Sequence, residues 1–230
     1  MIASSNSSKK CIYCFSRDVE TRDHVRPRSF FPKPRPSDLI TVPSCGQCNS
    51  GAGKDEEFFL ATFMFGPAGG TRVGKRLWDQ KIRRALGKNL GLRRRIAGNL
   101  HPVEVHSPYG LFIRKGMGIQ LENERHLRII RMITRGLYYF EFGEPLDPSV
   151  DIQSHFAQLS SEMAPIRPVM DQLRMGSRQW PGVFEYRFNR VEEKPDASIW
   201  VLMLYGVNVF WAISNDEELH EEPDLHSGAV

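Results

Sequence analysis

Short apolar runs alternate with polar and proline-rich segments along the first part of this chain. Runs rich in β-branched residues at 19–25 and 39–42 predict two short strands. The loop between them, 26–37, contains four prolines, which exclude a regular helix. A densely apolar run begins near Lys54 and ends at a Gly-Pro pair, so it predicts a helix with acidic residues in its first turn. The order strand, loop, strand, helix defines a ββα unit.

A second set of patterns follows a glycine-rich linker at 66–71. Apolar positions at three- and four-residue steps predict a basic amphipathic helix at 73–86 and a long helix at 123–142. Prolines break the ambiguous segment 152–174 into two short helices at most. The other predicted elements are strands at 103–106, 111–115, 118–121, 184–191, 199–205 and 209–213, of which the last two form a hairpin. The sequence therefore predicts an α+β fold, with a small ββα unit followed by a mixed α+β domain that ends in an antiparallel hairpin.

Length and composition support a folded protein, because 40% of the 230 residues are hydrophobic. No apolar run reaches the roughly 18 residues that a membrane span needs, and the N-terminus has no apolar segment typical of a secretory signal. We therefore expect a cytoplasmic protein with no membrane partner. The predicted segments are a disordered N-terminus (1–10), the ββα unit (11–66), a basic helix with the mixed domain (72–215) and an acidic tail (216–230).

All four cysteines lie in two CxxC pairs about 30 residues apart. Two thiolates separated by a tight turn can reach one metal ion, and two such pairs complete a tetrahedral zinc site. The alternative is a pair of disulfides, which a reducing cytoplasm disfavours. We therefore expect Cys11, Cys14, Cys45 and Cys48 to hold a structural zinc ion at the base of the ββα unit.

Three further polar residues in this unit do not fit the thiolate site. Asp23 and His24 lie in the first predicted strand, and Asn49 directly follows the last cysteine. Hydrolysis of a phosphodiester needs a base and a cation, and histidine titrates near neutral pH. Carboxylate and amide oxygens are suitable ligands for Mg²⁺ or Mn²⁺. Alternatively, Asn49 is a turn or helix-cap residue, and Asp23 is a polar partner of His24 or of an arginine.

Strand geometry constrains such a site. Neighbouring residues of a strand point to opposite faces, so Asp23 and His24 can serve one site at a bulge, at an irregular strand end, or around a metal that one of them reaches from the strand edge. Asn49 is expected in a turn that leads into the helix. A zinc ion would fix this turn against the first strand, which is a physical reason to build a catalytic site around a structural metal.

Charge is distributed unevenly, although the net charge is only +4. Residues 72–135 carry 16 Lys and Arg against 4 Asp and Glu, while residues 216–224 carry six acidic residues. A basic middle segment is typical of a surface that binds a polyanion, although a solvated helix face would look the same. The residues that we expect to contact nucleic-acid phosphates are Lys54, Arg72, Lys75, Arg76, Arg83, Arg84, Arg93, Arg94 and Arg95.

The motifs of residues 11–65, taken together, resemble the HNH endonuclease family of ββα-metal (His-Me finger) nucleases. The resemblance rests on Asp-His-Val-x-Pro, CxxCN and Lys-Asp-Glu-Glu-Phe, in this order and flanked by the two CxxC pairs. It implies that His24 is the general base, that Asp23 and Asn49 hold one catalytic divalent cation, and that the four cysteines bind structural zinc. The family's middle Asn is absent, so Asp38 or a backbone carbonyl would have to orient the base. Phe58 stands where many members have a helical His.

The sequence therefore predicts an HNH-type endonuclease, a phosphodiester hydrolase that acts on DNA with Mg²⁺ or Mn²⁺. The resemblance also makes a role in defence or in a mobile element plausible. One alternative is a catalytically degenerate zinc module that binds nucleic acid or a partner protein. Another is the nuclease subunit of a larger defence complex, which would be silent alone.

Overall fold

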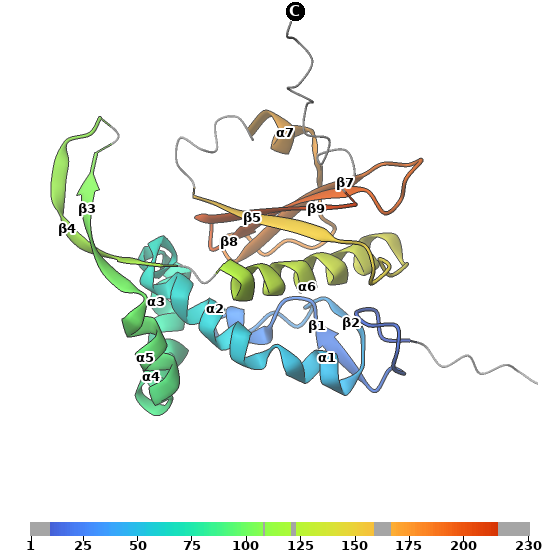
Figure 1. The fold of residues 1–230 in the computed structure, drawn as a ribbon, viewed down its shortest axis with the longest axis horizontal. Coiled ribbons are helices and arrows are strands. Elements are labelled where there is room, and N and C mark those ends of the chain that lie inside the picture. The colour runs from blue at the N-terminus through green and yellow to red at the C-terminus, as the bar shows by residue number, and fades with distance from the viewer. Residues whose placement is uncertain (1–9, 108, 121–122, 159–166, 216–230) are drawn as a thin grey trace, which may run out of the picture.

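A computed structural model describes residues 10–107, 109–120, 123–158 and 167–215 of the protein and has the α+β fold that the sequence predicts (Figure 1). The elements are β1 (Thr21–His24), η1 (Arg28–Phe30), β2 (Thr41–Ser44), α1 (Gly46–Gly51), α2 (Gly53–Phe65), η2 (Pro67–Gly70), α3 (Arg72–Leu77), η3 (Trp78–Ile82), α4 (Arg83–Lys88), α5 (Leu90–Gly98), β3 (Leu100–His106), β4 (Phe112–Ile119), α6 (Asn123–Phe142), β5 (Ile152–Gln158), α7 (Arg167–Gln172), β6 (Arg174–Met175), β7 (Phe184–Arg190), β8 (Ser198–Leu204) and β9 (Asn208–Ser214). The predicted N-terminal disorder, except at Lys10, and the predicted acidic tail lie outside the described residues. In the described part of the chain, no helix has the length and apolar character needed to cross a membrane.

The first part of the chain forms the predicted ββα arrangement. Strands β1 and β2 pair antiparallel in a regular register from Thr21–Ser44 to His24–Thr41, so β2 begins two residues later than predicted. Helix α2 matches its predicted bounds closely. Asn49 does not lie in a turn but in the short helix α1, because the Cys45 Sγ accepts a hydrogen bond from the Cys48 N–H and so caps that helix.

Helix α6 lies between the ββα unit and a five-stranded antiparallel sheet (Figure 1). The order of strands in this sheet is β5-β9-β8-β7-β6. One hydrophobic core runs through all three layers, with Phe59 from α2, Ile133 from α6 and Trp200 from β8 all buried in it. A β-carbon at Gly136 would lie 2.8 Å from the Val25 side chain, so this glycine allows α6 to approach the end of β1 closely.

Several predictions from the hydrophobic pattern are wrong. Residues 152–158 form the edge strand β5 instead of a helix, because they pair with β9 along their whole length. Two strands replace the three predicted between 103 and 121, since Gly116 continues β4 instead of interrupting it. The expected C-terminal hairpin exists as β8 and β9, but it is the centre of the larger sheet. Helix α5 was not predicted, because its three consecutive arginines obscure the apolar positions Leu92 and Ile96.

A buried arginine joins the ββα unit to the sheet. Arg26 is 3% exposed, and its guanidinium carbon lies 4.4–5.5 Å from the ring centroids of four aromatic residues. Those rings are Phe30, Phe31, Phe184 and Tyr205. Burial lowers the pKa of Arg26 to about 10, and nearby Tyr205 partly opposes this effect. Among the described residues, no carboxylate forms an ion pair with it. Ring faces therefore provide most of its electrostatic stabilisation.

This environment predicts losses of stability of different size for two substitutions of Arg26. A lysine ammonium is compact and strongly hydrated and cannot stack on several rings, so Arg26→Lys should lower the free energy of unfolding by on the order of 3 kcal/mol. Arg26→Met keeps a long apolar stem and removes the buried charge, so it should cost less than the lysine variant. Urea unfolding of both variants measures the difference. A lysine variant as stable as the wild type would show that the aromatic rings do not hold the guanidinium.

Candidate metal centre

Four free thiols converge at the base of the ββα unit. The Sγ atoms of Cys11, Cys14, Cys45 and Cys48 all lie within 4.8 Å of one another, and those of Cys14 and Cys45 are 4.0 Å apart. Sulfur ligands about 2.3 Å from a tetrahedral zinc ion stand about 3.8 Å from each other. The four cysteines are therefore positioned to bind one metal ion such as zinc.

The local backbone presents these thiols in two different ways. The first pair sits in a tight turn closed by hydrogen bonds from the Phe15 N–H to the Cys11 carbonyl and from the Ser16 N–H to the Cys14 carbonyl. This turn leaves Phe15 at a φ of +52°, which is unfavourable for a residue with a side chain. The second pair lies at the start of α1, where Cys45 is the cap.

The thiols influence one another's protonation. Hydrogen bonds from Ser16 lower the pKa of Cys14 to about 6, whereas burial and the neighbouring thiols raise the pKa of Cys48 well above its ordinary value. Four adjacent thiols cannot all ionise without a cation between them. A divalent metal would remove this conflict, so the donor set fits the group that the sequence predicts.

The predicted cation ligands lie on the side of β1 that faces the helices. Thr21 and Asp23 share one face of the strand, because they are two residues apart. The Asn49 Nδ2 donates to the Thr21 Oγ1 at 2.9 Å. In the described chain nothing donates to the Asn49 Oδ1, so this oxygen is available as a ligand. The Tyr13 hydroxyl donates to the Asp23 Oδ2 at 3.0 Å.

A second carboxylate belongs to this face. Burial raises the pKa of Asp23 to about 6, although the Tyr13 hydrogen bond opposes the shift. Burial and repulsion from Asp23 raise the pKa of Glu56, in the first turn of α2, to about 7, and Lys81 from η3 opposes that rise. Two half-buried carboxylates that repel each other are a common arrangement for a divalent cation. Asp23 and Glu56 are therefore close enough to interact electrostatically.

The raised pKa of Glu56 predicts a gain in stability when its charge is removed. Its folded pKa exceeds its ordinary 4.5, so the stability linked to the proton is complete below pH 4.5 and is lost as the pH rises through 7. At pH 8 without divalent cations, Glu56→Gln should raise the melting temperature by roughly 2–8 °C, as about 1–2 kcal/mol would do in a chain of this size. This advantage should vanish near pH 4.5.

The neighbouring variant Glu57→Gln is the matched control. The Glu57 Oε2 accepts a hydrogen bond from the Asn89 Nδ2 at 3.0 Å, so removing the Glu57 charge should give no gain in melting temperature. Adding Mg²⁺ or Mn²⁺ should stabilise the wild type more than Glu56→Gln. Equal stabilisation of both proteins would remove Glu56 from the cation site.

His24 lies at the other face of the strand end. The register of β1 stays regular through His24, so β1 has no bulge there, and His24 faces the opposite side of the strand from Asp23. Burial and the nearby Arg28 lower the pKa of His24, which keeps its imidazole neutral. Asp38 does not orient it, because Asp38 accepts from Arg178 at 2.6 Å and from the Trp180 Nε1 at 3.4 Å. No contact between His24 and Asn49 is found among the described residues.

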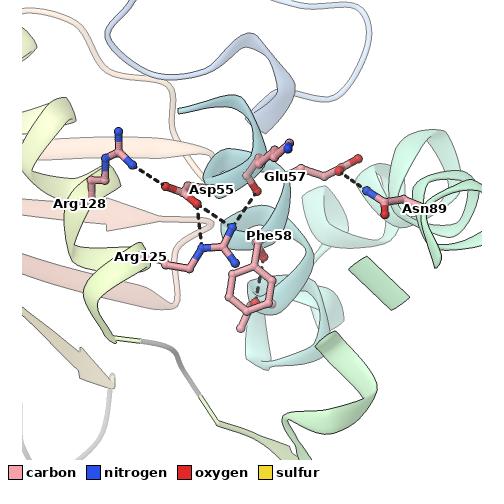
Figure 2. A network of polar contacts seen from close by, with 8 residues as sticks. Asp55, Glu57, Phe58, Asn89, Arg125 and Arg128 are labelled. Carbon is pink, nitrogen blue, oxygen red and sulfur yellow. Dashed lines mark hydrogen bonds and ion pairs between the residues drawn. The ribbon is translucent and has the colours of Figure 1, made fainter. Parts of the chain in front are cut away.

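A network of ion pairs fixes the helix that carries Glu56 (Figure 2). Asp55, in the first turn of α2, pairs with Arg125 at 2.6 Å and with Arg128 at 3.0 Å, both from α6. The Arg125 guanidinium also covers the buried ring of Phe58 at 4.7 Å. Phe58 therefore belongs to the core between α2, α5 and β4, and its apolar ring does not act as a metal ligand. The network holds the start of α2 against α6 and so positions the residues on either side of it.

Two basic surfaces flank this site. The predicted phosphate contacts are all exposed; they are Lys54, Arg72, Lys75, Arg76, Arg83, Arg84, Arg93, Arg94 and Arg95. A hollow of about 320 Å³ also opens beside Cys48 and Tyr13. Four arginines line it: Arg17, Arg128, Arg131 and Arg135. The sequence did not indicate this hollow, because Arg17 follows the first CxxC pair whereas the other three arginines come from α6, which is distant in the chain.

Glu56, Tyr13 and Lys81 are the site residues that sequence reasoning missed. In the sequence, Glu56 was explained as a carboxylate in the first turn of a helix. Tyr13 was explained as one of the two residues between the cysteines of a CxxC pair. Lys81 lies in the π-helical turn η3, a feature that often marks functional sites. Neither a family model, nor a curated protein, nor a solved structure matches this chain.

Proposed function

We propose that this protein is a metal-dependent endonuclease of the HNH type that hydrolyses DNA phosphodiester bonds. The observation that carries the proposal is the four-thiol cluster at the base of β1 and α1. A structural zinc held by Cys11, Cys14, Cys45 and Cys48 would keep Asn49 beside the strand that bears Asp23 and His24. The cysteines would therefore determine the geometry of the adjacent polar site.

Each polar residue has a role that suits its surroundings. His24 accepts the proton of the attacking water, and its lowered pKa keeps the ring neutral for that step. Asp23, Glu56 and the Asn49 Oδ1 would hold one Mg²⁺ or Mn²⁺ ion, which neutralises charge on the phosphate and on the leaving oxygen when it is bound. Lys81 lies close enough to these carboxylates to affect the pKa of Glu56, and it can contact the same phosphate.

Substrate affinity would come from the exposed arginines and lysines. The hollow lined by four arginines adjoins Tyr13, which itself bonds Asp23. Helices α3, α4 and α5 add the larger basic surface on the other flank. Phosphate contacts of this kind bind any sequence and weaken steeply with salt.

A plasmid-nicking assay with Mg²⁺ or Mn²⁺ tests the proposal, comparing the zinc-loaded wild type with His24→Ala and Asn49→Ala. We expect the wild type to cut and both variants to lose most of that activity. A wild type that cuts no better than His24→Ala, with and without candidate partner proteins, would refute the catalytic assignment.

The second candidate is a zinc module that binds nucleic acid or a partner protein without cutting. Two observations favour it. His24 has no orienting hydrogen bond within the described residues, and the Asn49 Nδ2 donates to the Thr21 Oγ1. DNA binding that persists in every variant, together with no cleavage, would support this candidate. Cleavage that appears only with a partner would instead indicate the nuclease subunit of a larger complex.

A further inference from the structure

The β3–β4 hairpin projects away from the rest of the molecule and exposes much of its apolar surface (Figure 1). Five of its large hydrophobic side chains are more than half exposed: Tyr109 92%, Leu111 70%, Ile113 59%, Met117 58% and Phe112 56%. Soluble proteins rarely place so many apolar side chains together in water unless a partner covers them. The hairpin is therefore an interaction surface whose partner has to be identified.

Hydrogen bonds of Ser107, directly after β3, join it to Leu111, directly before β4. The Ser107 N–H donates to the Leu111 carbonyl at 2.8 Å, and the Gly110 N–H donates to the Ser107 carbonyl at 2.9 Å. The Ser107 hydroxyl oxygen accepts from the Leu111 N–H at 3.1 Å. Gly110 has a φ of +80°, which few other residues adopt. These bonds fix the Leu111 backbone beside Ser107, where the two strands of the hairpin end.

On one face of the ribbon, β4 carries glycines instead of larger residues. Gly116 and Gly118 alternate along β4, and a β-carbon at Gly118 would lie 2.6 Å from the Val103 side chain. This face therefore carries no side chain from β4 except near its end at Arg114. Side chains of β3 occupy the space beside both glycines, since a β-carbon at Gly116 would lie 3.3 Å from Val105.

The positive charge next to the hairpin indicates which kind of partner it attracts. The hairpin follows α5, and the preceding segment 72–98, which spans α3, η3, α4 and α5, carries only one acidic residue, Asp79, against ten Lys and Arg. Arg114 and Lys115 extend this charge along β4, and both are exposed. A second copy of the chain would bring the same positive surface to the contact and be repelled. A polyanion is attracted to it.

We propose that the β3–β4 hairpin is a nucleic-acid-binding arm. Its ribbon enters a groove of duplex DNA, with the apolar tip residues against the bases, while the arginines of α4 and α5 contact the phosphates. A two-stranded ribbon fits the major groove, and apolar side chains at such tips can wedge between base steps. The inference deepens the proposed nuclease function, because it states how the same substrate is held.

DNA binding in a non-cutting background tests the arm. Fluorescence anisotropy with a labelled 24-base-pair duplex would be measured on zinc-loaded full chain carrying His24→Ala. Adding Leu111→Ser and Phe112→Ser should weaken binding about tenfold or more at every salt concentration without changing the salt slope. Adding Arg93→Gln and Arg94→Gln should instead reduce the slope of log K against log salt by about two, one for each lost phosphate contact.

The control is Met175→Ser, which removes a similarly exposed apolar side chain from β6 and should leave binding unchanged. A tip variant that binds DNA like its parent would overturn the proposal. If that variant also loses self-association by light scattering, the hairpin is a contact between copies of the chain. Since binding is measured without cleavage, failure of the nuclease proposal in the nicking assay leaves the arm intact, and the reverse also holds.

Discussion

Cys45→Ser should abolish stoichiometric zinc binding and destabilise the whole chain, not only its first fifty residues. Cys45 is fully buried and caps α1, and its Sγ lies 4.0 Å from the Cys14 Sγ. Structural zinc contributes about 10–16 kcal/mol to the folding of small zinc peptides. We expect a loss of more than about 4 kcal/mol here, because the ββα unit shares one core with α6 and the sheet.

The measurement pairs zinc content by mass spectrometry with calorimetric melting. The melting temperature of Cys45→Ser should fall by at least about 10 °C, which corresponds to a loss of that size in a chain of this length. The control is Gln47→Ser, an exposed residue between the two cysteines of the same pair, which should keep one zinc ion and the wild-type melting temperature. A wild type that is destabilised by reductant but not by a chelator would show that the cysteines form disulfides.

The local patterns of this sequence predicted the ββα unit well, since each element contains its own start and stop signals. Helix α2 is an example, with acidic residues at its start and a Gly-Pro pair at its end. Helix α6 matches its predicted bounds, and Ile130, Ile133 and Leu137 of its predicted apolar stripe are buried. Phe140 from the same stripe is 36% exposed, because the helix turns this position away from the sheet.

The five-stranded sheet could not be predicted from such local patterns. Strand β5 alternates only weakly and was obscured by the prolines that follow it, and only its pairing with β9 makes it a strand. Pairing across more than fifty residues depends on tertiary packing, which no local pattern contains. Arg26 illustrates the same limit, because two of the four rings around it, Phe184 and Tyr205, come from the sheet.

In the candidate site, too, some residues were predictable from local sequence and others depend on tertiary packing. The four cysteines were predicted to meet because two CxxC pairs at this spacing are typical of one shared metal ion, and their sulfur atoms do lie together. The electrostatic interaction of Glu56 with Asp23 depends on where α2 is held, and the ion pairs of Asp55 join the start of α2 to α6. Sequence thus predicts residues that a known spacing groups together, whereas neighbours that a helix brings from elsewhere appear only in the folded protein.

His24→Ala should lower the rate of DNA cleavage by about 10²–10⁴-fold, the usual contribution of a positioned general base. Zinc content, melting temperature and DNA affinity should stay at wild-type values, because the ring is only half-buried and supports no hydrogen bond among the described residues. The control is His155→Ala, which removes an exposed imidazole stacked on Trp211 in the sheet and should cut at the full rate.

The pH dependence of cleavage separates a base from a merely structural histidine. A base acts in its unprotonated form, so the rate falls as the pH drops through its pKa. Burial and Arg28 hold the pKa of His24 below 6.5, so the wild-type rate should stay constant down to about that pH and decline below it. Arg28→Ala removes the nearby positive charge and raises this pKa, so its decline should begin at a higher pH, with an unchanged rate at pH 8. If the two profiles coincide while His24→Ala is inactive, His24 contributes to cleavage by some means other than accepting the proton from water.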